Sequence, residues 1–171
     1  MTEAKPPSVA PCAASAEAPV VVLDTNVWLD LLLFEDARAV SLLAALIAGQ
    51  VTALSTQPMR DELADVLSRP FASGRTVAPE ALPARAAALS QLIDSTTLAG
   101  RCALKSPRCS DPDDQKFIDL AWAWPAAWLI SHDRALLTLA RPAWSRGLAI
   151  GTPAAWALAN GLVRTSTRPP P

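Results

Sequence analysis

The feature that most constrains the fold is a run of four apolar, β-prone residues, Val20–Leu23, that leads directly into an acid, Asp24. An uninterrupted apolar run of this length suits a strand that is buried on both faces, as in parallel sheets. Thr25 and Asn26 follow, and both residue types favour turns and helix N-caps. Asp24 should therefore lie at the carboxyl end of a central parallel strand, where open α/β sheets usually bind ligands.

Strand-like and helix-like segments alternate along most of the chain, which indicates βαβ units and a mostly parallel sheet. The later predicted strands cover residues 51–55, 95–102, 127–131 and 148–150. The predicted helices cover residues 27–33, 36–48, 57–69, 79–93 (as one helix or two short ones), 114–124, 134–139 and 153–160. We expect one α/β domain over residues 20–163, with flexible tails at residues 1–19 and 164–171.

Composition limits the class of protein. Hydrophobic residues make up 51% of the 171 residues and charged residues 18%, which is enough apolar material for a core. The formal net charge of −1 gives no global basic field for nucleic acid, although a local patch or a bound cation could supply positive charge. Three cysteines without a Cys-x-x-Cys pair argue against a disulfide framework or a zinc site. Without a signal-like or membrane-length apolar run, we expect a cytoplasmic protein with no membrane association.

Four acids that are far apart in the sequence occupy comparable places in this arrangement. Asp24 ends the first strand and Asp133 follows a later strand. Glu62 lies on the helix after the second strand, and Asp114 opens another helix. Because strand ends and the helix starts that follow them share one edge of a parallel sheet, all four can face one pocket. Each also has an ordinary interpretation, as a helix cap, a salt-bridge partner or solvated surface.

Electrostatics decide what such a pocket needs. Two carboxylates about 4 Å apart repel by roughly 4 kcal/mol at an effective dielectric constant of about 20. A divalent cation removes this repulsion, and ligands that are all oxygen select Mg²⁺ or Mn²⁺ rather than zinc. Such an ion would polarise a phosphoryl oxygen and activate a bound water. Asn26 and Ser131 lie next to two of the acids and are candidates to orient ligands or water.

Four segments resemble those of PIN-domain nucleases in their order and spacing, and more narrowly those of the bacterial PIN proteins that are toxin components of toxin–antitoxin systems. The segments are residues 21–28, 59–70, 111–121 and 129–137. The resemblance implies a three-layer α/β/α fold and a ribonuclease that depends on Mg²⁺ or Mn²⁺. The positions that match the family's catalytic and metal-binding acids are Asp24, Glu62, Asp114 and Asp133. The resemblance also implies that Asp113 assists the four acids and that the substrate is RNA. It further implies that a small antitoxin is a partner and that the chain can dimerise.

The leading hypothesis is therefore an endoribonuclease in which Asp24 and Asp114 are the principal metal ligands. By analogy with the family, the products carry a 5′-phosphate and a 3′-hydroxyl, and Arg60 or Arg134 could hold the phosphate. An aspartyl phosphatase is disfavoured because that chemistry usually requires a second Asp where Asn26 stands. A non-catalytic PIN-scaffold module that binds a protein or RNA partner is the alternative. The RNA target, the oligomeric state and the number of metal ions are left open.

Overall fold

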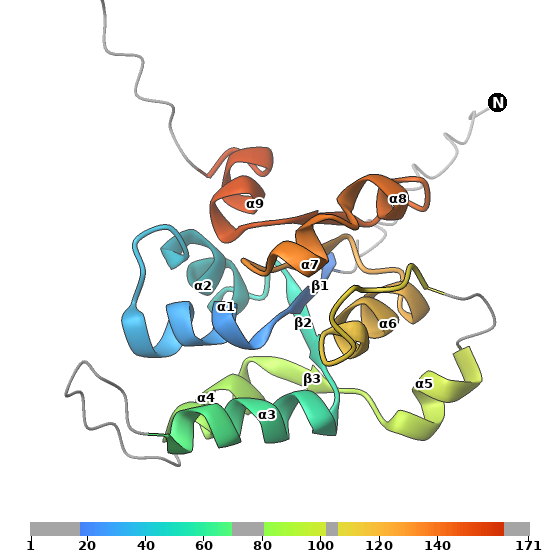
Figure 1. The fold of residues 1–171 in the computed structure, drawn as a ribbon. Coiled ribbons are helices and arrows are strands. Elements are labelled where there is room, and N and C mark those ends of the chain that lie inside the picture. Colours follow the sequence, from blue (N-terminus) through green and yellow to red (C-terminus); the bar gives the residue numbers. More distant parts are fainter. Residues whose placement is uncertain (1–17, 70–80, 102–105, 163–171) are drawn as a thin grey trace, which may run out of the picture.

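The structure is a computed structural model that describes residues 18–69, 81–101 and 106–162. Within these ranges, five parallel strands form one sheet in the order β3-β2-β1-β4-β5 (Figure 1). The strands are β1 (Val20–Leu23), β2 (Thr52–Ser55), β3 (Ser90–Leu92), β4 (Trp128–Ile130) and β5 (Ala149–Gly151). The order reverses between β1 and β4, so the carboxyl ends of these two strands form the switch point at which open α/β sheets bind ligands.

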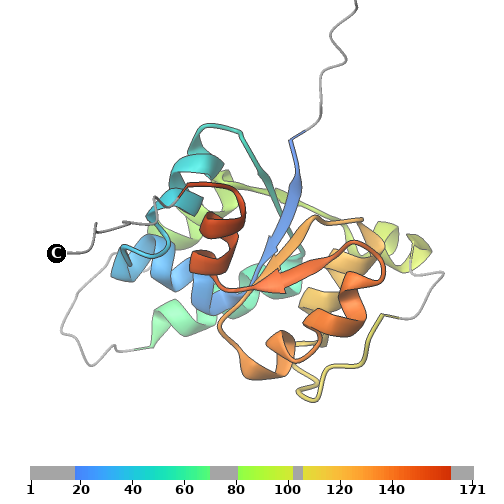
Figure 2. The same cartoon turned by 90° about the horizontal axis from the view of Figure 1, so that it is seen from above.

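Helices cover both faces of the sheet and make three layers (Figure 2). In chain order they are α1 (Thr25–Leu29), the π-helical η1 (Asp30–Phe34), α2 (Val40–Ile47), α3 (Gln57–Ser68), α4 (Ala81–Ala88), α5 (Ser95–Arg101), α6 (Gln115–Ala123), α7 (Arg134–Leu137), α8 (Ala140–Trp144) and α9 (Pro153–Ala159). Helices α1 to α4, η1 and α9 pack on one face, and α5 to α8 pack on the other. The predicted α/β/α sandwich with a mostly parallel sheet is thus confirmed.

Side chains of the central strand alternate between the two layers. Val21 and Leu23 belong to the core under α1 to α4, whereas Val22 belongs to the core under α6 to α8. All three are at most 1% exposed. Full burial of one such side chain contributes about 1.5–3 kcal/mol, so β1 is anchored from both sides. The residue that follows it, Asp24, is therefore held on a rigid element.

The edge strand β3 replaces the end of a predicted helix. The sequence predicts a helix over residues 79–93, but α4 ends at Ala88 and residues 90–92 pair with β2. Two of the three residues of β3 are exposed, so no apolar alternation marks it as a strand. Pairing with β2 decides the conformation of β3. The hydroxyl oxygens of Ser55 on β2 and Ser90 on β3 lie 3.1 Å apart.

Helix α5 occupies a segment that the sequence predicts as a strand over residues 95–102, of which the last lies outside the described residues. The β-branched Thr96 and Thr97 favour a strand by propensity. Asp94 opposes this, because its carboxylate accepts the backbone N–H of Thr96 at 3.3 Å and its carbonyl accepts that of Leu98 at 3.0 Å. A helix start of this kind overrides a weak strand preference. Helix α8 is also absent from the prediction.

The expected tails fall largely outside the described residues, at residues 1–17 and 164–171. Helix α2 ends as expected before Gly49, which adopts a φ of +66° that favours glycine. None of the helices within the described residues is both long and apolar enough to cross a membrane.

Candidate functional site

Asp24 lies at the switch point between β1 and β4, since its backbone N–H donates to the carbonyl of Ile130 at 3.1 Å. The residue is only 3% exposed. Its Oδ1 accepts the backbone N–H of Val27 at 2.9 Å, so Asp24 is the N-cap of α1. Burial raises the pKa of the Asp24 carboxyl, against the lowering effect of hydrogen bonds from Ser131 and Val27. Capping therefore accounts for one carboxylate oxygen and leaves the other to face β4.

Ser131, at the end of β4, connects Asp24 with Asp133. Its hydroxyl donates to Oδ2 of Asp24, and its Oγ accepts the backbone N–H of Asp133 at 2.8 Å. Ser131 is fully buried. Asp133 in turn caps α7 by accepting the backbone N–H of Ala135 on Oδ1 at 2.6 Å. One buried hydroxyl thus fixes the relative positions of two acids that are far apart in the sequence.

Asp114 precedes α6 but makes no capping hydrogen bond with its side chain, unlike Asp24 and Asp133. Burial and the charges of Asp133, Asp111 and Asp24 raise its pKa to about 6, and the charge of Lys116 opposes this rise. Because the charges of both Asp24 and Asp133 act on Asp114, the three carboxylates share one electrostatic environment. We call Asp24, Asp114 and Asp133 the switch-point acids.

Glu62 of α3 borders the same environment, but both of its carboxylate oxygens have partners. Oε1 accepts the hydroxyl of Thr25 at 2.7 Å, and Oε2 pairs with Nζ of Lys116 at 2.5 Å. Thr25 directly follows Asp24, and Lys116 lies two residues after Asp114. Both partners of Glu62 are therefore close in sequence to a switch-point acid. The sequence does not single out Thr25 or Lys116, because no local pattern shows which side chain reaches Glu62 across the fold.

The other two residues expected at the site lie at its edge. Asn26 is exposed and contributes a hydrogen bond from its backbone to Asp24. Asp113 is also exposed, and its carbonyl accepts a hydrogen bond from Nζ of Lys116. Both residues therefore act on the site through their backbone groups.

Arg60 has a structural role, and its expected contact with a phosphate stays a prediction. Its guanidinium donates to Oγ of Ser55 at 2.9 Å and to the carbonyl of Ser90 at 2.9 Å. These bonds tie the start of α3 to β2 and β3. Arg134 is exposed and directly follows Asp133, so its contact with a phosphate stays a prediction.

The chemistry of the switch-point acids fits a hard divalent cation. They offer only carboxylate oxygens, which suit Mg²⁺ or Mn²⁺, and a bound cation would relieve the repulsion that raises the pKa of Asp114. Among the residues that the structure describes, no three Asp, Glu, His or Cys side chains are grouped closely enough to hold an ion. The donor set, and not a closed cluster of ligands, is what indicates a cation.

The metal-free protein is expected to lose stability as the pH rises through the pKa of Asp114. A carboxyl whose pKa rises from 3.8 to about 6 on folding binds its proton more tightly in the folded state. Its contribution to stability is complete below pH 3.8 and is lost as the pH rises through about 6. Melting temperatures measured in chelator from about pH 4 to about pH 7 should therefore fall less, or rise more, in Asp114→Asn than in the wild type. The same pH dependence in both proteins would contradict this.

Ser131→Ala is expected to weaken divalent-cation binding and lower stability. The variant loses the hydroxyl that orients Asp24 and leaves the backbone N–H of Asp133 without its partner. Removing such an orienting group costs about 10- to 100-fold in metal affinity, and an unpaired buried group costs about 1–3 kcal/mol. Mn²⁺ calorimetry and urea unfolding measure the two effects. Ser145→Ala is the control, because its exposed hydroxyl bonds only to the nearby carbonyl of Pro142; equal losses in both variants would count against the role of Ser131.

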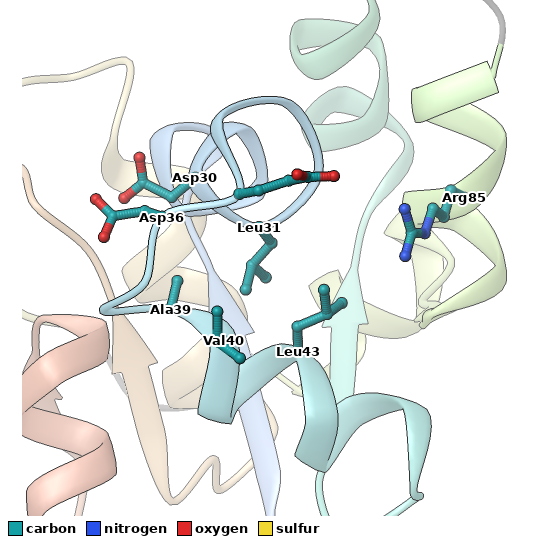
Figure 3. A pocket seen from close by; sticks show the side chains of 8 residues that line it. Asp30, Leu31, Asp36, Ala39, Val40, Leu43 and Arg85 are labelled. Atoms are coloured by element: carbon teal, nitrogen blue, oxygen red, sulfur yellow. The ribbon is translucent and has the colours of Figure 1, made fainter. Parts of the chain in front are cut away.

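A separate cavity of about 340 Å³ lies beside η1, α2 and α4. It is lined by Asp30, Leu31, Glu35, Asp36, Ala39, Val40, Leu43 and Arg85. Figure 3 shows the carboxylates of Asp30 and Asp36 side by side, with Arg85 across an apolar floor. Asp30 pairs with His132 at 2.7 Å and Asp36 with Arg38 at 2.6 Å. None of the switch-point acids is among the residues that line this cavity.

Comparisons with known proteins agree with this fold. The sequence profile of the PIN domain matches residues 20–135, more than half of the chain. Among solved structures, the fold is similar to that of VapBC2 from Rickettsia felis bound to a DNA fragment from its promoter, with a TM-score of 0.52, 14% identity, and coverage of 77% of this chain and 96% of that chain. No curated protein matches the chain. Since the profile matches more than half of the chain, the chain belongs to the PIN-domain family, whose members are generally nucleases.

Proposed function

We propose that the protein is a divalent-metal-dependent endoribonuclease and the toxin of a toxin–antitoxin pair. The observation that supports it most is the electrostatic environment of Asp114, whose pKa is raised to about 6 by burial and by the charges of Asp133, Asp111 and Asp24. Asp24 and Asp133 follow the adjacent strands β1 and β4. Carboxyl groups whose pKa is raised by burial and by neighbouring charges are typical of functional sites. Membership of the PIN-domain family, whose members are generally nucleases, also supports the proposal.

The switch-point acids would hold Mg²⁺ or Mn²⁺, with the ion pair of Glu62 and Lys116 beside them. When bound, such an ion polarises the scissile phosphoryl oxygen and activates the attacking water. The chain's own residues supply the positioning. Strands β1 and β4 fix two of the carboxylates, and Ser131 sets their relative orientation through its hydroxyl.

Cleavage of an RNA oligonucleotide labelled at its 5′ end tests the nuclease part of the proposal. We expect internal cuts with Mn²⁺ or Mg²⁺ and none with a chelator, and products that carry a 5′-phosphate and a 3′-hydroxyl by mass spectrometry. Cleavage that persists in the chelator would overturn the metal dependence. Absence of both cleavage and calorimetric Mn²⁺ binding would instead favour a PIN-scaffold module that binds a partner.

The toxin part of the proposal draws on the resemblance of four sequence segments to the PIN proteins of toxin–antitoxin systems, and on the likeness of the fold to VapBC2. The expected partner is a small antitoxin, and the expected place of action is the cytoplasm. Expression of the chain alone should arrest bacterial growth, and coexpression with the protein of the neighbouring reading frame should restore it. Growth that continues during expression of active enzyme would rule out the toxin role without touching the nuclease role.

A further inference from the structure

The ion pair of Lys116 with Glu62 puts a positive charge of the chain itself inside an otherwise acidic site. We propose that Lys116 is the built-in second cation of this site, so that the protein binds one divalent ion rather than two. Enzymes that cleave phosphodiesters often use two ions on either side of the reacting phosphate. Here the ammonium would take the place of one of them. This inference rests on the proposed metal dependence of the nuclease.

Three groups hold the ammonium of Lys116 in position. Nζ lies 2.5 Å from Oε2 of Glu62, and the two side chains are 26% and 33% exposed. Nζ also donates to the carbonyl of Asp113 and lies 4.9 Å from the ring centre of Phe117, which is itself 1% exposed. A carboxylate, a carbonyl and an aromatic face therefore surround a charge that a lysine would otherwise keep in solvent.

The same contacts give each carboxylate oxygen of Glu62 a partner, and one of these partners is a cation. Its Oε1 accepts the hydroxyl of Thr25 at 2.7 Å, and Thr25 is only 6% exposed. Its Oε2 already carries the ammonium of Lys116. A divalent ion on that oxygen would lie close to the ammonium, and the two positive charges would repel each other. Glu62 is thus paired with lysine, while the switch-point acids remain for the single ion.

Counting Mn²⁺ ions bound to the metal-free full-length chain tests the inference. We expect one ion in the wild type, by calorimetry and by electron paramagnetic resonance of the free Mn²⁺. Lys116→Met should bind two, because Glu62 loses its cation and becomes available as a ligand. The double variant Lys116→Met/Glu62→Gln should return to one ion, since the second site requires that carboxylate.

Arg69→Met is the matched control. It removes a cation that pairs with Asp65 on the same helix as Glu62, on a surface where both partners are more than half exposed. It should bind one ion, and Lys116→Arg, which retains the charge, should also bind one. Circular dichroism checks the fold of each variant.

Two ions in the wild type, or one ion in a folded Lys116→Met, would overturn the inference. If Lys116→Met does not fold, the wild-type count and Lys116→Arg decide the question. An RNA cleavage assay on the same wild-type preparation distinguishes a failure of the Lys116 inference from a failure of the nuclease proposal. A wild type that cleaves RNA and binds two ions refutes the role of Lys116 alone, whereas a wild type that neither cleaves nor binds Mn²⁺ refutes the nuclease proposal and this inference together.

Discussion

Asp24→Asn should abolish RNA cleavage and leave the protein at least as stable as the wild type. Asp24 is the most buried of the switch-point acids, and its loss removes a charged ligand for the cation. Metal-ion catalysis contributes several kcal/mol of transition-state stabilisation, so cleavage should fall at least about a thousandfold. Asparagine remains a good N-cap, and the hydrogen bond to the N–H of Val27 can persist.

Stability should not fall because the charge of Asp24 is unfavourable in the folded state. Burial raises the pKa of Asp24, so the carboxyl binds its proton more tightly when folded, and its ionisation costs stability as the pH rises through that pKa. A neutral asparagine removes this cost at neutral pH. Initial cleavage rates with Mn²⁺, together with urea unfolding, measure the two effects. Asp65→Asn is the control, since that carboxylate is 62% exposed and pairs with Arg69 on the surface. A folded Asp24→Asn that cleaves at the wild-type rate would disprove the assignment.

Trp156→Ala should lower the free energy of unfolding by about 3–5 kcal/mol. Trp156 of α9 is 2% exposed and belongs to the core that also contains α1 to α4. Truncating a buried tryptophan to alanine costs about 3–5 kcal/mol, against a total stability of about 5–15 kcal/mol for ordinary domains. The residue lies beyond the match to the PIN-domain profile, which ends at residue 135. A large loss of stability in Trp156→Ala would show that β5 and α9 complete the domain.

Trp144→Ala provides the matched comparison for Trp156→Ala. Trp144 lies on α8 and is 68% exposed. A surface substitution of this kind changes the free energy of unfolding by about 0.5 kcal/mol or less. Urea denaturation followed by circular dichroism gives both values. Equal losses of stability in the two variants would mean that α9 does not pack on the core as the structure places it.

Elements with a strong local pattern were predictable, and elements that depend on a neighbour were not. Strand β1 has the predicted boundaries because its four apolar residues can be buried only between two layers. Helix α3 begins after Thr56, a residue type that favours helix N-caps. Strand β3 has no such pattern, since most of it is exposed and only pairing with β2 makes it a strand. The structural bond of Arg60 was unpredictable for the same reason, because its partner Ser90 lies on that unpredicted strand.

The sequence alone determined that buried strands end in acids, and a parallel sheet requires such ends to share one edge. That reasoning reached Asp24 and Asp133 from the apolar run before each acid. The tertiary structure alone decided that β4 pairs directly with β1, which allows Ser131 to donate to Asp24 across 107 positions of sequence. It also decided that Lys116 neutralises Glu62. Such contacts form only when helices and strands pack together, so they leave no periodic or local signal in the sequence.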